Sequence, residues 1–453
     1  MVDGAKDRHE VDDSLSIEAS VRRVLWLRLA ADSTAPLIVA FSGGSDSLAL
    51  LLIAKAWADE VGRRLLAVTV DHRLHQDGAR WASLAKARAE RAGIEHRTLS
   101  WEAEKPTAGV AAAARAARHG LVAGEAWRIG ARVILMGHTA DDCREAAAMR
   151  ASGEPTPTPR TWAPSPIWPG GRGRFILRPL LGVCRADLQA MLSLRGERWI
   201  EDPANVDVRH PRARARAMLS VAAPSGPQAK DEGPCEVRVR IRSGPVGEMY
   251  LEREAVQALS GSAKRRCIGS ALLCASGGER PPRGAAVDRL ANAFGSGQTF
   301  TANLAGARVE CDGPQLRFMR EPGDLRRSGA PAAQLPLGAP VVWDGRYQLT
   351  ACVAGLTARA LDGLAGRLPP LQRNALQGSP LAARRALCTV VDGDGRASCP
   401  TLTEDRRVEV TWLVADRLAG ALGAVQSEAA IGCVAEDPVG PYMEVWKRRG
   451  EAN

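Results

Sequence analysis

Between residues 36 and 136 the chain alternates short apolar runs with longer amphipathic stretches. The apolar runs predict strands at residues 36–41, 64–70, 96–101 and 132–136. The stretches between them predict helices at residues 47–61, 78–92 and 109–130, and a further helix begins near residue 141. Strands that are apolar throughout and alternate with helices are typical of a parallel sheet covered on both faces. The pattern therefore predicts an α/β fold with a doubly wound parallel sheet, in which ligands collect at the carboxyl ends of the strands.

The remaining segments predict the domain organisation. A short amphipathic helix is expected at residues 16–31, within an N-terminal extension of residues 1–33. Residues 152–174 are rich in Pro and Gly and predict an irregular or partly disordered loop. We expect a catalytic domain at 34–220, a linker at 221–234, and smaller mixed α+β regions at 235–330 and 331–453.

The charge, the cysteines and the apolar segments of the chain each favour or disfavour particular classes of protein. Lys and Arg exceed Asp and Glu by 61 to 51, a formal charge of +10, which is compatible with a polyanionic partner such as nucleic acid. None of the ten cysteines forms a C-x-x-C pair, which disfavours a zinc ribbon or an iron–sulfur site. The first residues lack the apolar core of a secretory signal, and no run approaches the roughly 18 apolar residues of a membrane span. We expect a cytoplasmic protein without a membrane partner.

The most informative segment follows the first predicted strand and reads Ser42-Gly43-Gly44-Ser45-Asp46-Ser47. The two glycines let the backbone turn tightly and approach a ligand. The helix that follows presents free N–H groups and the positive end of its dipole, which favour an anion. The serine hydroxyls add donors for phosphate oxygens, whereas Asp46 suits Mg²⁺ bound to a pyrophosphate group. The segment predicts a binding site for the phosphates of a nucleotide.

Other interpretations of this segment are a flexible turn without a ligand and a different phosphate motif. The tight bracketing by a buried strand and a helix disfavours a simple turn. A Walker A loop requires G-x-x-x-x-G-K-[ST], and a dinucleotide fold requires G-x-G-x-x-G; the segment matches neither.

Polar residues follow two further strands. Asp71 and His72 end the second strand and would face the same crevice, on the nucleotide side. After the strand at 132–136 come His138, Asp141 and Asp142, as candidates for binding a metal or a cationic amine or for proton transfer. The alternative is that the acids only cap helices or stabilise turns.

Arginines and tryptophans supply candidate nucleic-acid contacts. Arg115 and Arg118 lie three residues apart on one helix face, which either clamps a phosphate or nucleotide or is an ordinary solvated face. Trp162 and Trp168 either stack on an unpaired base or anchor the 152–174 loop. A basic run expected to contact RNA follows later in the chain: Arg212, Arg214 and Arg216.

The SGGSDS segment resembles the pyrophosphate loop of the N-type ATP pyrophosphatases, the PP-loop superfamily, whose fold is Rossmann-like. Members split ATP between the α- and β-phosphates and transfer AMP to a substrate oxygen. The ordered series SGGSDS, VDHRLH, AAARAARH, GHTADD and RPLLG…WIEDP is more specific and looks like the lysidine synthase family over about residues 34–218. The chain departs from the usual family pattern at Cys143, at Ala146 and in the sequence of the 152–174 loop.

The resemblance implies a reaction in two steps. ATP and Mg²⁺ bind residues 42–47, and the oxygen on carbon 2 of the first anticodon cytidine of tRNA(Ile), with a CAU anticodon, is adenylylated. The ε-amine of free L-lysine then displaces AMP. Asp46, His138, Asp141 and Asp142 would be catalytic, with Asp46 and Asp141 as metal ligands. Asp71 and His72 would bind ATP beside the loop.

Two rival functions stay open. One is another adenylylating enzyme of the superfamily, of the tRNA thiolation or amidotransferase type, and the other is an inactive RNA-binding relative. A paired-cysteine site and an N-terminal amidotransferase cysteine are missing from the sequence, and the intact acidic loop argues against an inactive relative. The sequence leaves open whether the chain acts as a monomer or a dimer.

Overall fold

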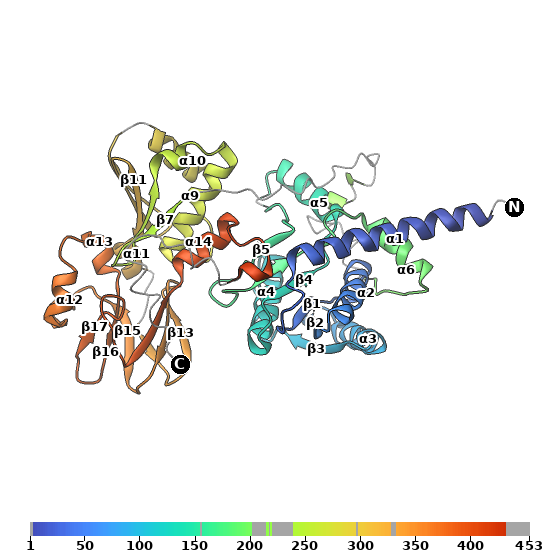
Figure 1. Cartoon of the computed structure of the whole chain (residues 1–453), viewed down its shortest axis with the longest axis horizontal. Helices are drawn as coiled ribbons and strands as arrows, with labels where there is room; N and C mark the ends of the chain where they lie inside the picture. The colour runs from blue at the N-terminus through green and yellow to red at the C-terminus, as the bar shows by residue number, and fades with distance from the viewer. Residues whose placement is uncertain are drawn as a thin grey trace. The chain divides into compact units, whose positions relative to one another are not determined.

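A computed structural model of the chain describes residues 3–154, 156–201, 214–216, 218–219, 239–295, 298–327 and 332–431, with side chains from residue 16 onward. The chain forms two compact units (Figure 1). Met1–Pro234 and Val425–Gly432 make up the first, and Cys235–Ala424 and Cys433–Asn453 the second. The second unit thus spans the boundary that the sequence suggested near residue 330.

The first unit is built on one six-stranded sheet, in the order β3-β2-β1-β4-β6-β5. All strands run parallel except β5, which pairs antiparallel with β6 at the edge. The strands are β1 (Leu37–Ala40), β2 (Leu65–Asp71), β3 (Glu95–Ser100), β4 (Val133–Met136), β5 (Trp162–Pro164) and β6 (Phe175–Leu177). The four predicted strands and the predicted parallel α/β sheet are confirmed.

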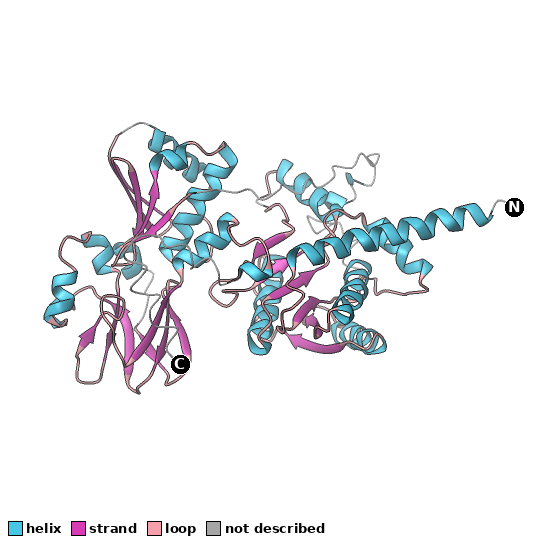
Figure 2. Cartoon of the chain, in the orientation of Figure 1, coloured by secondary structure: helices cyan, strands magenta, loops and turns pink. Residues whose placement is uncertain are grey.

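Helices cover both faces of this sheet, as Figure 2 shows. They are α1 (Asp3–Arg28), α2 (Ser45–Glu60), α3 (Gly78–Arg91), α4 (Val110–Ile129), α5 (Ala140–Ala151) and α6 (Arg185–Leu194). Successive β1 side chains point to opposite faces, yet Leu37, Ile38 and Val39 are all fully buried. Ile38 packs in a cluster with Val122 and Ala126 of α4. Burial on both faces explains why this strand is apolar throughout.

The first helix is longer than the sequence suggested. We expected a helix at 16–31, whereas α1 extends from Asp3 to Arg28 and packs against α2 and α6. Val21 and Leu25 are fully buried, and their spacing of four residues forms the contacting stripe. The polar residues before residue 16 lack this apolar stripe, so the sequence pattern did not predict that they are helical.

The loop of residues 152–174, expected to be irregular, contains β5 and ordered turns. Trp162 is 6% exposed and stacks on Phe175, with ring centroids 5.0 Å apart. Its indole N–H donates to the carbonyl of Val425 at 2.9 Å. Of the two roles considered for Trp162, the structure supports the anchoring of the loop rather than the stacking of a base.

The C-terminal piece of the first unit is held by a buried ion pair. Glu428, in a short 3₁₀ turn (η3, Glu428–Ala430), accepts hydrogen bonds from Nη1 and Nη2 of Arg63 at 2.7 and 2.9 Å. The two side chains are only 2% and 1% exposed. Arg63 also donates to the carbonyls of Ala30 and Ala35, so every buried charge here has a partner. We refer to residues 425–431 as the C-terminal strap.

The second unit begins with an antiparallel five-stranded sheet, in the order β7-β8-β11-β10-β9. Alternate residues of β10, among them Val309 and Cys311, are buried in a cluster that includes Ile268 and Leu272 of α9. The elements are β7 (Ile241–Ser243), β8 (Met249–Glu252), α8 (Arg253–Gln257), α9 (Gly261–Ser276), α10 (Gly284–Gly295), β9 (Phe300–Leu304), β10 (Ala307–Asp312), β11 (Gln315–Arg320) and α11 (Pro322–Arg327).

Two smaller sheets complete the second unit, in the orders β12-β15-β16-β17 and β13-β14-β18. Their strands share one apolar cluster that contains Tyr347, Leu356 and Cys388. The elements are β12 (Ala333–Leu335), β13 (Pro340–Trp343), β14 (Tyr347–Ala351), β15 (Leu356–Ala360), η2 (Ala365–Arg367), α12 (Pro370–Ala375), α13 (Leu381–Arg385), β16 (Cys388–Val391), β17 (Ala397–Ser398), β18 (Val408–Trp412) and α14 (Val414–Leu422). Within the described ranges of both units, no helix is long and apolar enough to cross a membrane.

Candidate active site

Residues 42–47 form a tight loop between β1 and the first turn of α2. Gly43 has a φ of +84°, a conformation that glycine adopts without a Cβ penalty. Gly44 is the N-cap of α2 and provides no side-chain cap, so the first N–H groups of the helix remain for an anion. The Ser47 hydroxyl donates to the Gly44 carbonyl at 3.0 Å and lies 3.1 Å from the Ser42 hydroxyl, which closes the loop.

A segment distant in sequence covers the loop. The Ile200 N–H donates to the Gly43 carbonyl at 2.9 Å. A Cβ placed on Gly43 would lie 2.5 Å from Cδ1 of Ile200. The WIEDP stretch of the sequence therefore contributes to the loop site, although sequence reasoning gave Ile200 no role.

The loop after β4 approaches the phosphate loop closely. A Cβ on Gly137 would lie 3.0 Å from the Asp46 carbonyl oxygen and 3.1 Å from the Cα of Ser47. Because both atoms belong to the backbone, only glycine fits at position 137 without movement of the chain. This contact brings the His138–Glu145 segment to the start of α2, as predicted from the parallel order of the strands.

Arg185, the first residue of α6, lies among the acids of this crevice. Its Nη2 and Nε contact Oδ2 of Asp46 at 2.8 and 2.9 Å. Glu145 and Asp142 lie 3.7 and 3.9 Å from the same guanidinium. Burial alone would lower the pKa of Arg185, but the hydrogen bond to Asp46 and the charges of the three acids raise it. Three carboxylates thus gather around one cation beside the phosphate loop.

The two adjacent acids have different partners. Asp142 and Thr139 form a capping box at the start of α5, in which Oδ2 of Asp142 accepts from the Thr139 N–H at 2.9 Å. Asp141 accepts from Arg144 at 2.7 Å and, through Oδ2, from the Arg185 N–H at 2.7 Å. The geometry gives Asp141 a role in fixing the start of α6.

Glu145 is an acidic residue to which sequence reasoning assigned no role. It is 1% exposed, and its Oε1 accepts from Nε of Arg216 at 2.8 Å. Its Oε2 is buried and has no hydrogen-bond partner among the described residues. Since a buried carboxylate oxygen needs a donor, Glu145 is suited to bind an N–H or O–H group of a substrate.

His138 is also fixed by an arginine. Nδ1 of His138 accepts from Nε of Arg178 at 3.2 Å, which leaves Nε2 to carry the proton of the neutral ring. Burial, together with the charges of Arg115 and Arg118, lowers the pKa of Arg178 to about 10. The neighbouring His119 is 3% exposed, and burial and the same two arginines lower its pKa to about 2.

Asp71 and His72 lie at the end of β2, the strand next to β1. Oδ1 of Asp71 accepts from the Arg73 N–H at 2.9 Å and would lie 2.7 Å from a Cβ on Gly78. His72 packs edge-on against Trp101, and burial and the charge of Arg118 lower its pKa. Asp71 therefore stabilises a turn in this structure, while His72 is a neutral ring near the α4 arginines.

The predicted arginine contacts divide into three groups. Arg115 and Arg118 are half-buried, and both lower the pKa of His119 and of Arg178. Arg118 also lowers the pKa of His72, so the two arginines lie at this crevice. Arg216 binds Glu145, whereas Arg214 is exposed. Arg212 lies outside the described residues.

The residues fit Mg²⁺ only together with a nucleotide. Within the described part of the chain, no group of three or more His, Cys, Asp or Glu side chains could hold a metal ion. Mg²⁺ in nucleotide sites commonly uses one or two carboxylates and takes its other ligands from phosphates and water. Asp46 fits that pattern, whereas both carboxylate oxygens of Asp141, the second predicted ligand, already accept hydrogen bonds.

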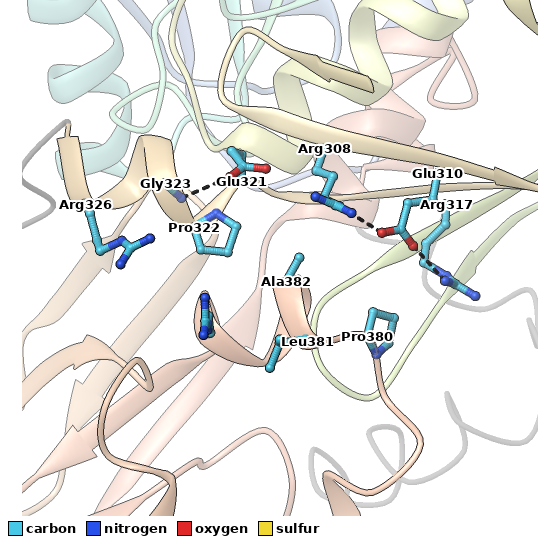
Figure 3. A pocket seen from close by; sticks show the side chains of 11 residues that line it. Arg308, Glu310, Arg317, Glu321, Pro322, Gly323, Arg326, Pro380, Leu381 and Ala382 are labelled. Atoms are coloured by element: carbon cyan, nitrogen blue, oxygen red, sulfur yellow. Dashed lines mark hydrogen bonds and ion pairs between the residues drawn. The ribbon is translucent and has the colours of Figure 1, made fainter. Parts of the chain in front are cut away.

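The second unit has a charged pocket of about 330 Å³ (Figure 3). Arg308 and Arg317 both donate to Glu310, at 2.8 and 2.9 Å. Arg326 and Arg385 lie on the rim, with side chains 63% and 46% exposed, and each is 3.7 Å from Asp362. The pocket lies between β10, β11, α11 and α13, and its rim arginines are open to solvent.

The fold and the crevice define a PP-loop ATP-binding domain, and the family model described as "PP-loop domain" matches residues 17–222. The chain is 42% identical to tRNA(Ile)-lysidine synthase of Caulobacter vibrioides over 90% of its own length and 98% of that relative. It is 32% identical to tRNA(Ile)-lysidine synthase of Brucella anthropi over 69% of this chain and 73% of that one. The chain belongs to the tRNA(Ile)-lysidine synthase family.

A solved structure with a weaker likeness is the U34-tRNA thiolase NcsA from Methanococcus maripaludis with its [4Fe-4S] cluster. It is 13% identical with a TM-score of 0.39, covering 47% of this chain and 73% of that one.

Proposed function

We propose that this protein is a ligase that forms lysidine in tRNA(Ile) with a CAU anticodon. It uses ATP to adenylylate the carbon-2 oxygen of the first anticodon cytidine, with release of pyrophosphate. The ε-amine of lysine then forms a bond to carbon 2, and AMP leaves with the oxygen. The observation that carries the proposal is the crevice in which the 42–47 loop meets three carboxylates around Arg185.

In the first step the chain positions the reacting groups. The N–H groups at the start of α2 and the serine hydroxyls bind the phosphates of ATP, and Asp46 faces the same place. Mg²⁺, held by Asp46 together with the nucleotide, would supply positive charge next to the leaving pyrophosphate. Fixed donors that stabilise developing charge account for most of the catalysis expected of such a site.

Binding of Mg²⁺ through Oδ2 would require a change of partners at Asp46. Oδ2 of Asp46 is engaged by Arg185, so a metal ion at this carboxylate would replace that contact. Asp142 and Glu145 lie within 3.9 Å of the released guanidinium and would keep it in the crevice.

In the second step we expect an acidic side chain of the crevice to bind the ε-amine of lysine. The unpartnered Oε2 of Glu145 is suited to accept a hydrogen bond from the ε-amine and to orient it toward the cytidine. His138, with Nε2 protonated in its neutral form, is the candidate for proton transfer with the reacting base. Asp141 and Asp142 act indirectly, by fixing the starts of α6 and α5.

The tRNA would also contact residues outside the catalytic crevice. We assign phosphate contacts to Arg115 and Arg118 and, beyond the described ranges, to Arg212. In the second unit, the rim arginines Arg326 and Arg385 are suited to the RNA backbone. We place the reaction in the cytoplasm, where tRNA is modified.

A pyrophosphate-release assay tests the function. Release should require tRNA(Ile) with a CAU anticodon, and lysine should appear in the tRNA only in the second step. Asp46→Asn should lower the rate by roughly 100-fold or more, the range for loss of one charge-stabilising group. Glu145→Gln should impair lysine incorporation more than pyrophosphate release.

The same assay separates the rival functions. Release without tRNA, or with an unrelated tRNA only, would contradict the assignment. Incorporation of sulfur or of another amine would indicate a different adenylylating enzyme. Binding of tRNA without any release would indicate an inactive relative.

A further inference from the structure

Besides the catalytic crevice at the carboxyl ends of the parallel strands, the first unit has a basic surface at their amino ends. It consists of Trp127, Arg132, Arg172 and Arg174, and we call it the Trp127 surface. Arg132 and Arg174 directly precede β4 and β6, and the Phe175 N–H donates to the Arg132 carbonyl at 2.9 Å. The surface is thus at the amino ends of strands whose carboxyl ends lead to His138 and Arg178.

The surface combines an exposed aromatic ring with stacked cations. Trp127, in the last turn of α4, is 41% exposed. The guanidinium carbons of Arg172 and Arg174 lie 4.3 and 4.4 Å from the centroid of its ring. Such cation–π contacts hold the planar groups together without neutralising the charge.

The loop that carries the two arginines is tightly built. Nη1 of Arg172 donates to the Pro169 carbonyl at 3.2 Å, and the Ser165 N–H donates to the Arg174 carbonyl at 2.9 Å. A Cβ on Gly171 would lie 2.6 Å from the Ile167 carbonyl oxygen, so the turn requires glycine. The arrangement is therefore formed before any partner binds.

Two arginines of the surface, Arg132 and Arg174, have no acidic partner within the described residues, and Nε of Arg174 is buried there without a hydrogen-bond acceptor. Burial, with the charges of Arg172 and Arg132, lowers the pKa of Arg174 to about 10. On the same helix, Arg128 is paired with Glu125 at 2.7 Å. The charges of Arg132 and Arg174 are therefore open to neutralisation by an anionic ligand, which would stabilise the surface.

We propose that the Trp127 surface is a second RNA-binding surface, which contacts the substrate tRNA outside its anticodon loop. Guanidinium groups bind phosphates, and the planes of guanidinium groups held by an aromatic ring also stack on an unpaired base. The seven residues from Arg132 to His138 span roughly 20 Å of extended chain, so one nucleotide cannot reach both the surface and the reacting cytidine. The inference rests on the proposed function, because that function supplies the RNA.

The test compares full-length tRNA(Ile) with its isolated anticodon stem-loop as ligands of the full chain. Arg172→Ala/Arg174→Ala should weaken binding of the full-length tRNA by about tenfold or more and reduce the slope of log K against log salt by about 1 to 2. Binding of the stem-loop should change less than about twofold. Arg132→Glu, at an exposed position, should act in the same direction if the double variant does not fold.

Arg128→Glu is the matched control, since it changes an arginine next to Trp127 that already has a carboxylate partner. It should weaken binding of the full-length tRNA less than Arg132→Glu does. Unchanged binding of full-length tRNA by both the double variant and Arg132→Glu would overturn the inference, and so would an equal loss for the stem-loop. If wild-type protein releases pyrophosphate with tRNA while the variants bind as wild type, the inference fails but the proposed function stands.

Discussion

At the residue scale, the site shows how neighbouring acids take on different roles. Asp46 and Glu145 point into the crevice around Arg185, whereas Asp142 caps α5 and Asp141 holds the first N–H of α6. Sequence spacing placed these residues in one region but did not separate their roles. The roles depend on Arg185 and Arg216, which lie 40 or more residues further along the chain than these acids.

Gly43 provides a sharp test of the phosphate loop. In Gly43→Ala the new Cβ would meet Ile200 at 2.5 Å in a backbone conformation with φ +84°. We expect the KM for ATP to rise by at least about tenfold, because Ile200 and the phosphate loop must move apart.

Gly62→Ala is the control for this prediction. Its φ is +69°, but nothing lies within 4 Å of the new Cβ. This variant should lose about 1 kcal/mol of stability and keep its KM. Equal kinetic effects of the two variants would show that Ile200 does not constrain the loop.

His119 predicts a dependence of stability on pH. Its pKa of about 2 in the folded protein lies below the usual 6.5 of histidine, so the unfolded chain binds a proton that the folded chain does not. Stability should therefore fall as the pH drops below about 6.5, by up to about 1.4 kcal/mol per pH unit from this residue.

The free energy of unfolding, measured in urea at several pH values, should depend less steeply on pH in His119→Phe. The slope should correspond to one proton fewer taken up on unfolding below about pH 6.5. An unaltered slope in His119→Phe would contradict the assignment of a neutral buried ring.

At the element scale, periodicity predicted the elements whose residues are buried in a regular pattern. The strands β1, β2 and β4 and the helices next to them are apolar where they pack, so the sequence pattern indicated their positions. The 152–174 loop was different, because its order depends on Trp162 bonding to Val425, 263 residues away. Such long-range contacts leave no local pattern in the sequence.

The C-terminal strap should contribute strongly to the first unit. Glu428→Ala leaves the buried guanidinium of Arg63 without its counter-ion, and we expect the unfolding free energy of this unit to fall by about 3–5 kcal/mol. Urea unfolding followed by tryptophan fluorescence measures the loss.

Two further variants control this prediction. Arg63→Met/Glu428→Leu should be less damaging than Glu428→Ala, because no charge is left buried. Glu102→Ala removes an exposed pair with Arg73 and should cost less than about 1 kcal/mol. A similar cost for Glu428→Ala and Glu102→Ala would contradict the role of the strap.

At the scale of the whole molecule, the +10 charge favours a polyanionic partner, which would bind at sites that expose arginines. The pocket in the second unit is one such site. Arg326→Ala/Arg385→Ala should weaken binding of tRNA at low salt and reduce its salt slope by about 1 to 2. Neither arginine packs in the core, so the melting temperature should stay within a few degrees of wild type.

Arg265→Ala is the control, because Arg265 lies on α9, which packs on the other face of the five-stranded sheet, and pairs with Asp288. Its effect on tRNA affinity should be small. Equal losses for this control and for the pocket variants would indicate a general effect of charge instead of a binding site.

The ion pair between Arg63 and Glu428 also affects the order of events during synthesis. Glu428 leaves the ribosome 365 residues after its partner, which at bacterial rates of about 5–20 residues per second is a delay of roughly 20 to 70 s. During that interval the nascent catalytic unit holds an arginine without its counter-ion. Its final consolidation therefore waits until Glu428 has been synthesised, and chains cut short before Glu428 should be vulnerable to proteases.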